Sequence, residues 1–384
     1  MRFEFATVGR ILFGPGTLKE FPPLAPTFGK RALLVSGRSM ELNKSLVQQL
    51  EGHGMSVSVF AVEHEPTVQL VRQGLAIARQ TQCDCVIALG GGSAIDAGKA
   101  IAVLLTNPGD VLDYLEVVGE GKSITQPGVP LITIPTTAGT GAEVTRNAVL
   151  LVPEERVKVS LRSPHLLARL AVVDAELTYS LPPDVTASTG MDALVQLIEP
   201  FLSPRATPIT DALCREAIPR AAQALPRAYG DGQDSRARED LSLASLFSGL
   251  ALANAGLGAV HGFASVIGGL VSAAHGAICA RLLSPVMAAN YRALQERDAE
   301  SPILTRFDEV ARLVTGAASA RAADGIAWLA DLCTALAIPR LSDVGLTRGD
   351  FPWVVEHTQS ASSTKANPIR LTTEELMEIL EAAY

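Results

Sequence analysis

Short apolar runs alternate with amphipathic runs over the first half of the chain. The short runs are typical of buried strands, and the longer ones place apolar residues on one face of a helix. The expected strands cover residues 32–36, 56–62, 85–89 and 131–134, and the expected helices cover residues 41–51, 68–80 and 96–105. This alternation predicts a parallel sheet with helices on both faces, and such sheets bind ligands at the carboxyl ends of their strands.

Long alanine- and leucine-rich runs replace this pattern after residue 182. The expected helices cover residues 185–201, 209–225, 237–255, 277–294, 302–315, 322–337 and 373–383. We expect the second of them to be broken or kinked at Pro219, because proline lacks the N–H group that a helix interior uses. The sequence therefore predicts an α/β domain over residues 1–182 and an all-helical domain over residues 183–384.

Composition fits a folded globular enzyme with two domains, since the chain has 384 residues, 48% of them hydrophobic and 19% charged. The net charge of −8 argues against nucleic acid or an anionic membrane as the main partner. Five scattered cysteines favour a reducing, cytoplasmic location. Two of them, Cys83 and Cys85, are expected on one face of a strand. No run of 18 apolar residues and no signal-peptide pattern is present, so we expect no membrane span.

Two of the six histidines, His261 and His275, are each followed by glycine in an apolar background. Gly268-Gly269 lies between them and predicts a break between two helices, the second of which begins at His275. Imidazoles from adjacent helices can share one metal ion, and imidazole suits zinc or iron. The alternative is a pair of core histidines, each bonded to a backbone carbonyl.

Two glycine-rich segments follow expected strands: GGGS at residues 90–93 and PTTAGTGAE at residues 135–143. Glycine lets the backbone approach a pyrophosphate, and a helix N-terminus offers free N–H groups. Neither segment is a GxGxxG or a P-loop motif, and either alone is often only a turn. Two of them at strand carboxyl ends favour a nucleotide site.

Longer segments around these residues resemble the iron-containing, or group III, alcohol dehydrogenases. They are GGGSAIDAGKA, PTTAGTGAEVT, KVSLRSP, GMDALVQLIEPFLS, GLGAVHG and AAHGAICARLLSPVM, and the likeness runs from Phe13 to Pro368. The resemblance implies an N-terminal dinucleotide-binding α/β domain and a C-terminal all-α metal-binding domain. It further implies oxidation of an alcohol or reduction of an aldehyde with NAD or NADP, a small-molecule substrate and a homodimer.

The resemblance also implies roles for particular residues. Asp192, His261 and His275 match the ligands of a divalent metal, Fe2+ or Zn2+, and would act in catalysis through it. The residues matched to the cofactor site are Gly37, Ser39, Gly91, Gly92, Ser93, Asp96, Thr136, Thr137, Thr140 and Lys158. Glu143 and Lys99 are expected in a local ion pair or hydrogen bond rather than in catalysis.

The chain departs from the family pattern in two places. Gln196 stands where most members carry a fourth ligand, a histidine, and it shares a helix face with Asp192. It either ligates the metal or only hydrogen-bonds near it, since three protein ligands suffice for a catalytic zinc site. Ser265 replaces a histidine near the substrate in many relatives, so proton transfer or substrate choice is expected to differ.

The segment after the first expected strand bears on the choice of cofactor. Residues 36–39 read Ser-Gly-Arg-Ser, without the aspartate that NAD-specific relatives place on the adenosine ribose. Arg38 and Ser39 could bind a 2′-phosphate, which favours NADP slightly, although a solvated turn is an equal alternative.

Three other functions share part of this pattern. A maleylacetate reductase is a dehydrogenase relative that acts on an acidic substrate. A dehydroquinate synthase has the same architecture but needs a dense basic cluster for a phosphorylated substrate, and none lies near His261 or His275 in the sequence. A catalytically impaired nucleotide-binding member would explain Gln196 and Ser265, but the three matched ligands argue against it.

Overall fold

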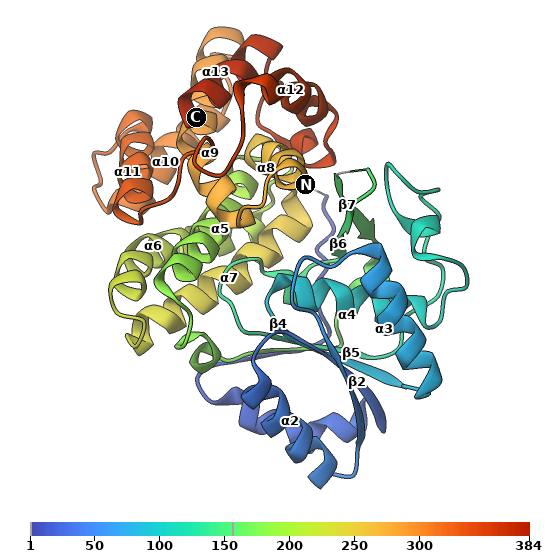
Figure 1. Cartoon of the computed structure of the whole chain (residues 1–384). Coiled ribbons are helices and arrows are strands. Elements are labelled where there is room, and N and C mark those ends of the chain that lie inside the picture. The colour runs from blue at the N-terminus through green and yellow to red at the C-terminus, as the bar shows by residue number, and fades with distance from the viewer. Residues whose placement is uncertain (1, 156) are drawn as a thin grey trace. The chain divides into compact units, whose positions relative to one another are not determined.

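The computed structural model describes residues 2–155 and 157–384, which form two compact units (Figure 1). One unit contains Ala6–Thr137 and Gly141–Thr178, and the other contains residues 2–5, Ala138–Thr140 and Tyr179–Tyr384. The first is a parallel α/β unit and the second is all helical, so the predicted fold class is confirmed. The predicted domain limits, residues 1–182 and 183–384, stay a prediction.

Six parallel strands form the sheet of the α/β unit, in the order β1-β8-β5-β4-β2-β3. Their bounds are β1 Ile11–Phe13, β2 Arg31–Ser36, β3 Ser56–Ala61, β4 Cys85–Gly90, β5 Leu131–Pro135 and β8 Leu170–Val173. A separate antiparallel hairpin joins β6 Asn147–Val152 to β7 Val157–Arg162. The sequence pattern misses β1 and β8, whose three and four residues are too few to show a period, and it also misses the two six-residue strands of this hairpin.

The order of the strands creates a switch point between β2 and β4. From β2 the chain moves to the edge strand β3, and then returns to the other side of β2 to form β4 and β5. The amide of Gly37, directly after β2, donates to the carbonyl of Leu89 in β4 at 2.9 Å. Doubly wound sheets bind ligands outside the strand carboxyl ends at such a point.

Helices cover both faces of this sheet (Figure 1). Helix α2 (Met40–Gly52) packs its Leu46 and Leu50 on the same core cluster as Leu34 and Ile87. The opposite face carries α3 (Val68–Gln80) and α4 (Gly92–Leu104), while the short α1 (Phe21–Leu24) joins the α2 side. Gly98 lets α4 approach the sheet, because a methyl group there would lie 2.7 Å from the Ala88 Cβ.

Two sequence predictions about the α/β unit are wrong in detail. Helix α4 begins at Gly92, four residues before the predicted start at Asp96, because the glycine-rich segment itself forms the first turn. Cys83 precedes β4 and is partly exposed, so it does not share a strand face with the buried Cys85.

The helical unit is built around α5, which is buried along most of its length against α6, α7 and α9. The bounds are α5 Pro183–Leu202, α6 Pro208–Gly230, α7 Ser235–Ala255, α8 Ala259–Leu270, α9 His275–Arg297, α10 Ile303–Thr315, α11 Ala322–Ala335, α12 Phe351–Ser360 and α13 Thr373–Ala383. A break at Pro219 is excluded, because α6 continues through it, whereas the alternative of a kink stays a prediction. The predicted glycine break is also displaced: Gly268 and Gly269 lie in the last turn of α8, which ends at Leu270, and the link is residues 271–274.

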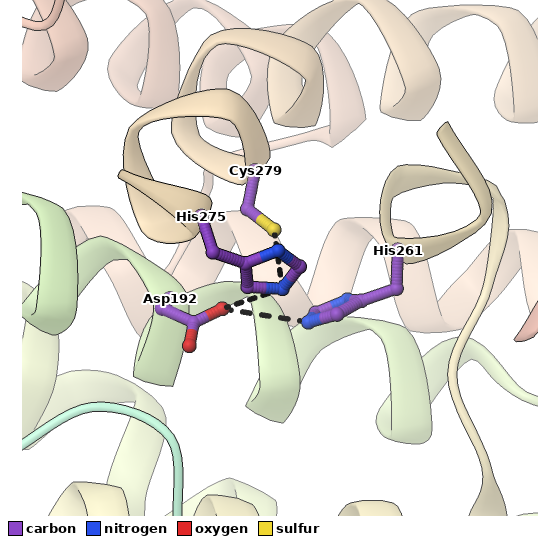
Figure 2. A group of neighbouring side chains, drawn as sticks. All are labelled: Asp192, His261, His275 and Cys279. Atoms are coloured by element: carbon purple, nitrogen blue, oxygen red, sulfur yellow. Dashed lines mark hydrogen bonds and ion pairs between the residues drawn. The ribbon is translucent and has the colours of Figure 1, made fainter. Parts of the chain in front are cut away.

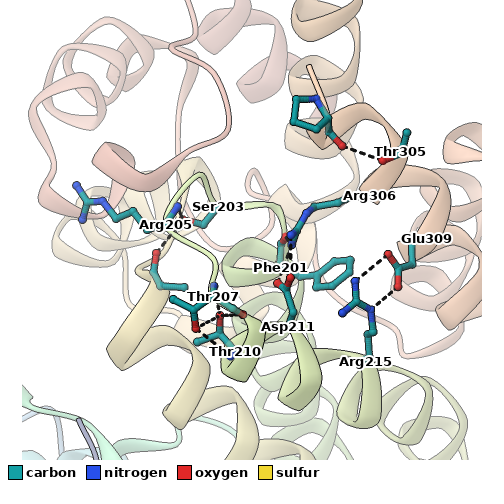
Figure 3. A network of polar contacts seen from close by, with 12 residues as sticks. Phe201, Ser203, Arg205, Thr207, Thr210, Asp211, Arg215, Thr305, Arg306 and Glu309 are labelled. Carbon is teal, nitrogen blue, oxygen red and sulfur yellow. Dashed lines mark hydrogen bonds and ion pairs between the residues drawn. The ribbon is translucent and has the colours of Figure 1, made fainter. Parts of the chain in front are cut away.

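An ion-pair network ties α6 to α10 at the end of α5 (Figure 3). The Arg306 guanidinium donates to Asp211 at 2.7 and 2.8 Å and to the Phe201 carbonyl at 2.8 Å. Arg215 pairs with Glu309, and both arginines lie about 5 Å from the Phe201 ring centroid. The network satisfies a carbonyl that the α5 terminus leaves without a helical partner.

No single helix in the described part of the chain is long and apolar enough to cross a membrane. The pair α7 and α8 meets the criteria of length and composition only when taken together, and it is bent by 101°. Apolar residues of both helices belong to the core cluster of the helical unit.

Candidate metal and cofactor sites

Three loops at neighbouring strand ends form the candidate cofactor site of the α/β unit. Gly37 follows β2, Gly91 follows β4, and Thr136 and Thr137 follow β5. The Thr136 amide donates to the Gly90 carbonyl at 3.0 Å, and a methyl group on Gly91 would lie 3.5 Å from the Thr137 Cγ2. The structure therefore brings these predicted cofactor residues together beside the switch point.

Two helices begin at this edge of the sheet. Gly91 is the N-cap of α4, and Gly92 and Ser93 are its first residues. Ser39 is the N-cap of α2, where its side chain makes no capping hydrogen bond. The first N–H groups of a helix lack intrahelical partners and, together with the helix dipole, suit phosphate oxygens.

The remaining predicted cofactor residues have different surroundings. Asp96, in α4, accepts a hydrogen bond from the Val149 amide at 3.0 Å, which fixes the β6–β7 hairpin on the helix. Lys158, in β7, pairs with Glu65 at 2.9 Å. Thr140 is grouped with the helical unit, and its role at the cofactor stays a prediction.

Lys99 is completely buried behind the glycine-rich loop. Its Nζ donates to Thr145 Oγ1 at 2.7 Å and to the Asn147 carbonyl at 2.8 Å, and it lies 3.7 Å from Asp96 Oδ1. Burial raises the pKa of Asp96 to about 6 and that of Glu143 to about 7, although the Lys99 charge opposes both shifts. The expectation that Lys99 belongs to a local ion pair is confirmed.

Asp192, His261 and His275 converge in the helical unit (Figure 2). Asp192 comes from α5, His261 from the first turn of α8, and His275 is the first residue of α9. Asp192 Oδ1 lies 3.4 Å from His261 Nε2 and 4.0 Å from His275 Nε2, and the two ring centroids are 5.5 Å apart. One carboxylate oxygen and two imidazole nitrogens, from three helices, thus lie close enough together to bind one ion.

Two of these atoms are buried without a hydrogen-bond partner among the described residues: Asp192 Oδ1 and His261 Nε2. Leaving a buried polar atom unsatisfied costs about 1–3 kcal/mol. Carboxylate oxygen and imidazole nitrogen are ligands of zinc and iron, so one divalent cation would satisfy both atoms. The residues present therefore fit a divalent metal.

Glu199 orients the His261 ring. One carboxylate oxygen lies 2.7 Å from His261 Nδ1, and the other accepts from the Val260 amide at 2.7 Å. Because the carboxylate can only accept, Nδ1 carries the proton and Nε2 presents its lone pair to the cluster. His261 thus bonds a carboxylate rather than the backbone carbonyl that the core-histidine alternative predicts.

The close approach of α9 to α5 depends on Gly276. A methyl group there would collide with the Ser188 carbonyl and would lie 3.1 Å from the Asp192 Cβ. The glycine after His275 is therefore what allows this histidine to reach Asp192.

The electrostatics of the cluster favour a cation. Burial lowers the pKa of His261, but Cys279, Glu199 and Asp192 together raise it well above its ordinary value. The pKa of His275 is also raised: burial lowers it, and Cys279 and Asp192 more than compensate. Negative groups therefore outweigh the cost of burying positive charge at this point.

Gln196 points at the cluster, as its spacing from Asp192 predicts, but both ends of its amide are engaged. Its Nε2 donates to Asp192 Oδ2 at 2.8 Å, and its Oε1 accepts from Ser248 at 3.0 Å. The arrangement favours the second of the two predicted roles, in which Gln196 orients the carboxylate without ligating the metal.

We expect Gln196→Ala to keep bound metal at saturating concentration but to lower metal affinity about tenfold, as loss of a group that orients a ligand commonly does. Competition with a chromophoric chelator measures the affinity. Ser242→Ala is a matched control, because Ser242 is also buried and polar but lies in α7 rather than in α5. Complete loss of metal from Gln196→Ala would instead make Gln196 a ligand.

Cys279 also lies at the cluster, and sequence reasoning missed it. Its Sγ lies 3.5 Å from His275 Nε2, and donor atoms of Asp192, His261, His275 and Cys279 all lie within 4.8 Å of one another. Burial raises the pKa of the Cys279 thiol, but the two imidazoles more than compensate and hold it below its ordinary value. Its spacing of four residues from His275 on one helix was the available signal.

A parallel α/β unit with glycine loops at its switch point and a helical unit with a carboxylate–imidazole cluster define a metal-dependent dehydrogenase. The family model for iron-containing alcohol dehydrogenase matches residues 9–175, and the model for the C-terminal part of the Fe-containing family matches residues 186–384. The chain belongs to the iron-containing alcohol dehydrogenase family, an oxidoreductase family that acts on CH–OH groups.

Individual relatives support this assignment over the full length. The 1,3-propanediol dehydrogenase of Klebsiella pneumoniae is 34% identical over 100% of this chain and 99% of its own. A crystal structure of a 1,3-propanediol oxidoreductase matches with a TM-score of 0.93 and 32% identity over 100% of both chains. The sulfoacetaldehyde reductase of Bifidobacterium kashiwanohense, solved with NAD+, matches with a TM-score of 0.87 and 29% identity over 100% of this chain and 99% of that one. The predicted family and enzyme class are confirmed.

Proposed function

We propose that Asp192, His261 and His275 hold the divalent metal of this alcohol dehydrogenase, and that the loops after β2, β4 and β5 hold its nicotinamide cofactor. The observation that carries the metal assignment is the pair of buried, unsatisfied atoms, Asp192 Oδ1 and His261 Nε2. The metal supplies a Lewis acid for the substrate oxygen, and the nicotinamide supplies or accepts the hydride.

The residues of the chain have binding and orienting roles in this proposal. Glu199 keeps the proton of His261 on Nδ1, and Gln196 holds the Asp192 carboxylate in place. The amides at the start of α4 bind the pyrophosphate, and the glycines there allow its close approach. Ser265 donates to the Gly262 carbonyl at 2.9 Å, so we assign it no proton-transfer step.

Metal analysis of protein purified without added metal tests the proposal, followed by assays of an alcohol and aldehyde panel with NADH and NADPH. We expect about one divalent ion, iron or zinc, per chain and turnover that a chelator removes. Full activity of demonstrably metal-free protein would contradict the assignment. A homodimer and a cytoplasmic location are further proposals that rest on the family resemblance and on composition.

We expect NADPH to be accepted at least as well as NADH. Arg38 follows β2, and its side chain donates to the Glu63 carbonyl at 2.9 Å and contacts His64 at 3.3 Å. An exposed guanidinium beside the start of α2, without a carboxylate in residues 36–39, can bind a 2′-phosphate. The measurement is kcat/KM for both cofactors in wild type and in Arg38→Ala, which should weaken NADPH alone. A strong preference for NADH that Arg38→Ala leaves unchanged would contradict this prediction.

A further inference from the structure

We propose that Cys279 is a fourth protein ligand of the metal and binds it as a thiolate. The inference rests on the proposed function, because it assumes the metal at Asp192, His261 and His275. It assigns to this chain a ligand set of one carboxylate, two imidazoles and one thiolate.

The distances between the ligand atoms are compatible with one shared ion. At bond lengths of about 2.0–2.3 Å to O, N and S, neighbouring ligand atoms lie about 3–4 Å apart, and the ion must keep a further coordination position for the substrate oxygen. The Cys279 Sγ to His275 Nε2 distance is 3.5 Å, and Asp192 Oδ1 lies 3.4 Å from His261 Nε2 and 4.0 Å from His275 Nε2. Figure 2 shows the Cys279 sulfur directed toward the His275 ring, and the ligand atoms of all four residues lie within 4.8 Å of one another.

The other polar side chains beside the three proposed ligands already form hydrogen bonds within the protein. Gln196 gives its amide N–H to Asp192 and accepts from Ser248. Glu199 bonds the far nitrogen of the His261 ring and the Val260 amide. In the described part of the chain, Cys279 is the one other His, Cys, Asp or Glu whose ligand atom joins the three proposed ligands within 4.8 Å.

The helix geometry directs Cys279 to this place. His275 and Cys279 lie one turn apart near the start of α9. This end of the helix packs closely against α5, because Gly276 has no side chain to prevent the contact. The buried Cys333 provides a contrast, since its thiol donates to the Ala280 carbonyl at 3.1 Å and is not part of the cluster.

Cysteine binds a metal ion as the thiolate rather than as the thiol. The sulfur–metal bond forms as the S–H bond is lost, and the proton passes to the solvent. Thiolate donors favour zinc over harder ions such as magnesium.

Cobalt(II) titration of the metal-free protein tests the proposal, because a thiolate bound to cobalt gives an intense near-ultraviolet charge-transfer band. We expect this band in wild type and in Cys333→Ser, and its loss in Cys279→Ser. Cobalt affinity should fall at least about tenfold in Cys279→Ser and stay unchanged in Cys333→Ser, since even groups that only orient a ligand change affinity by 10–100-fold.

The outcomes separate this inference from the proposed function. If wild type binds cobalt with visible ligand-field bands but without the near-ultraviolet band, Cys279 is not a ligand and the metal site stands. If wild type binds no cobalt, or if His261→Ala binds it as tightly as wild type, the metal site fails and Cys279 fails with it. Should Cys279→Ser not fold, the wild-type spectrum still decides.

Discussion

His275→Ala is expected to lower kcat/KM by about three to four orders of magnitude while nucleotide binding stays intact. A Lewis acid at the substrate oxygen contributes several kcal/mol to catalysis, and each 1.36 kcal/mol is about a factor of ten in rate. His275 is the first residue of α9, and its Nε2 lies 4.0 Å from Asp192 Oδ1 and 3.5 Å from the Cys279 sulfur. Its removal opens one side of the cluster.

Three measurements on the same preparation check this prediction: kcat/KM, bound metal per chain, and NADH affinity by fluorescence. His357→Ala is the matched control, because His357 lies in α12, bonds the Trp353 carbonyl at 2.8 Å and is not part of the cluster. We expect metal and activity to fall together in His275→Ala and NADH affinity to change less than about twofold, since the nucleotide loops belong to the other unit. Wild-type activity of a chelated His275→Ala protein would contradict the metal assignment.

Local signals determine how far the elements could be predicted. The predicted helix over residues 68–80 has the bounds of α3, because the apolar period is regular and Thr67 caps the helix by accepting from the Leu70 amide at 3.0 Å. At Pro219 the expected break does not occur, because burial of α6 against α5 and α7 stabilises the helix by more than the one missing hydrogen bond costs. Tertiary packing decides such cases, and a local pattern does not contain it.

In the candidate metal site, too, the local spacing of residues could be predicted and the tertiary packing could not. Asp192, Gln196 and Glu199 are spaced by four and three residues, so their common helix face could be predicted from the sequence alone. Which groups on other helices this face meets could not be predicted, because that depends on the packing of α8 and α9 on α5. Glu199 and Cys279 were therefore missed, although each shares a helix face with a predicted ligand.

Lys99→Met is expected to destabilise the α/β unit by about 3–5 kcal/mol, the usual cost of removing one partner from a buried charge cluster. The Lys99 cation is completely buried, and its loss leaves the Asp96 and Glu143 carboxyl groups without a counter-charge. Hydrogen exchange of the α4 and β4 amides measures the free energy of opening of this unit directly. Lys122→Met is the control, because Lys122 is an exposed cation of the same unit, and the exchange of α4 should not change in this variant.

The pH dependence of that stability has a definite sign. Burial raises the pKa of Glu143 from 4.5 to about 7 and that of Asp96 from 3.8 to about 6. A carboxyl group with a raised pKa in the folded state binds its proton more tightly there than in the unfolded chain. Its contribution to stability is therefore complete below the unfolded pKa and is lost as the pH rises through the folded pKa.

Wild-type protection of α4 should consequently decrease between about pH 4.5 and pH 7, by about 3 kcal/mol from Glu143 at 1.36 kcal/mol for each pKa unit. Glu143→Gln removes this titration and should flatten the profile over that range. Lys99→Met should instead make the decrease steeper and extend it to higher pH, because the cation that favours both ionised carboxylates is gone. A protection profile of Lys99→Met that runs parallel to that of wild type would show that Lys99 does not interact with these carboxyl groups.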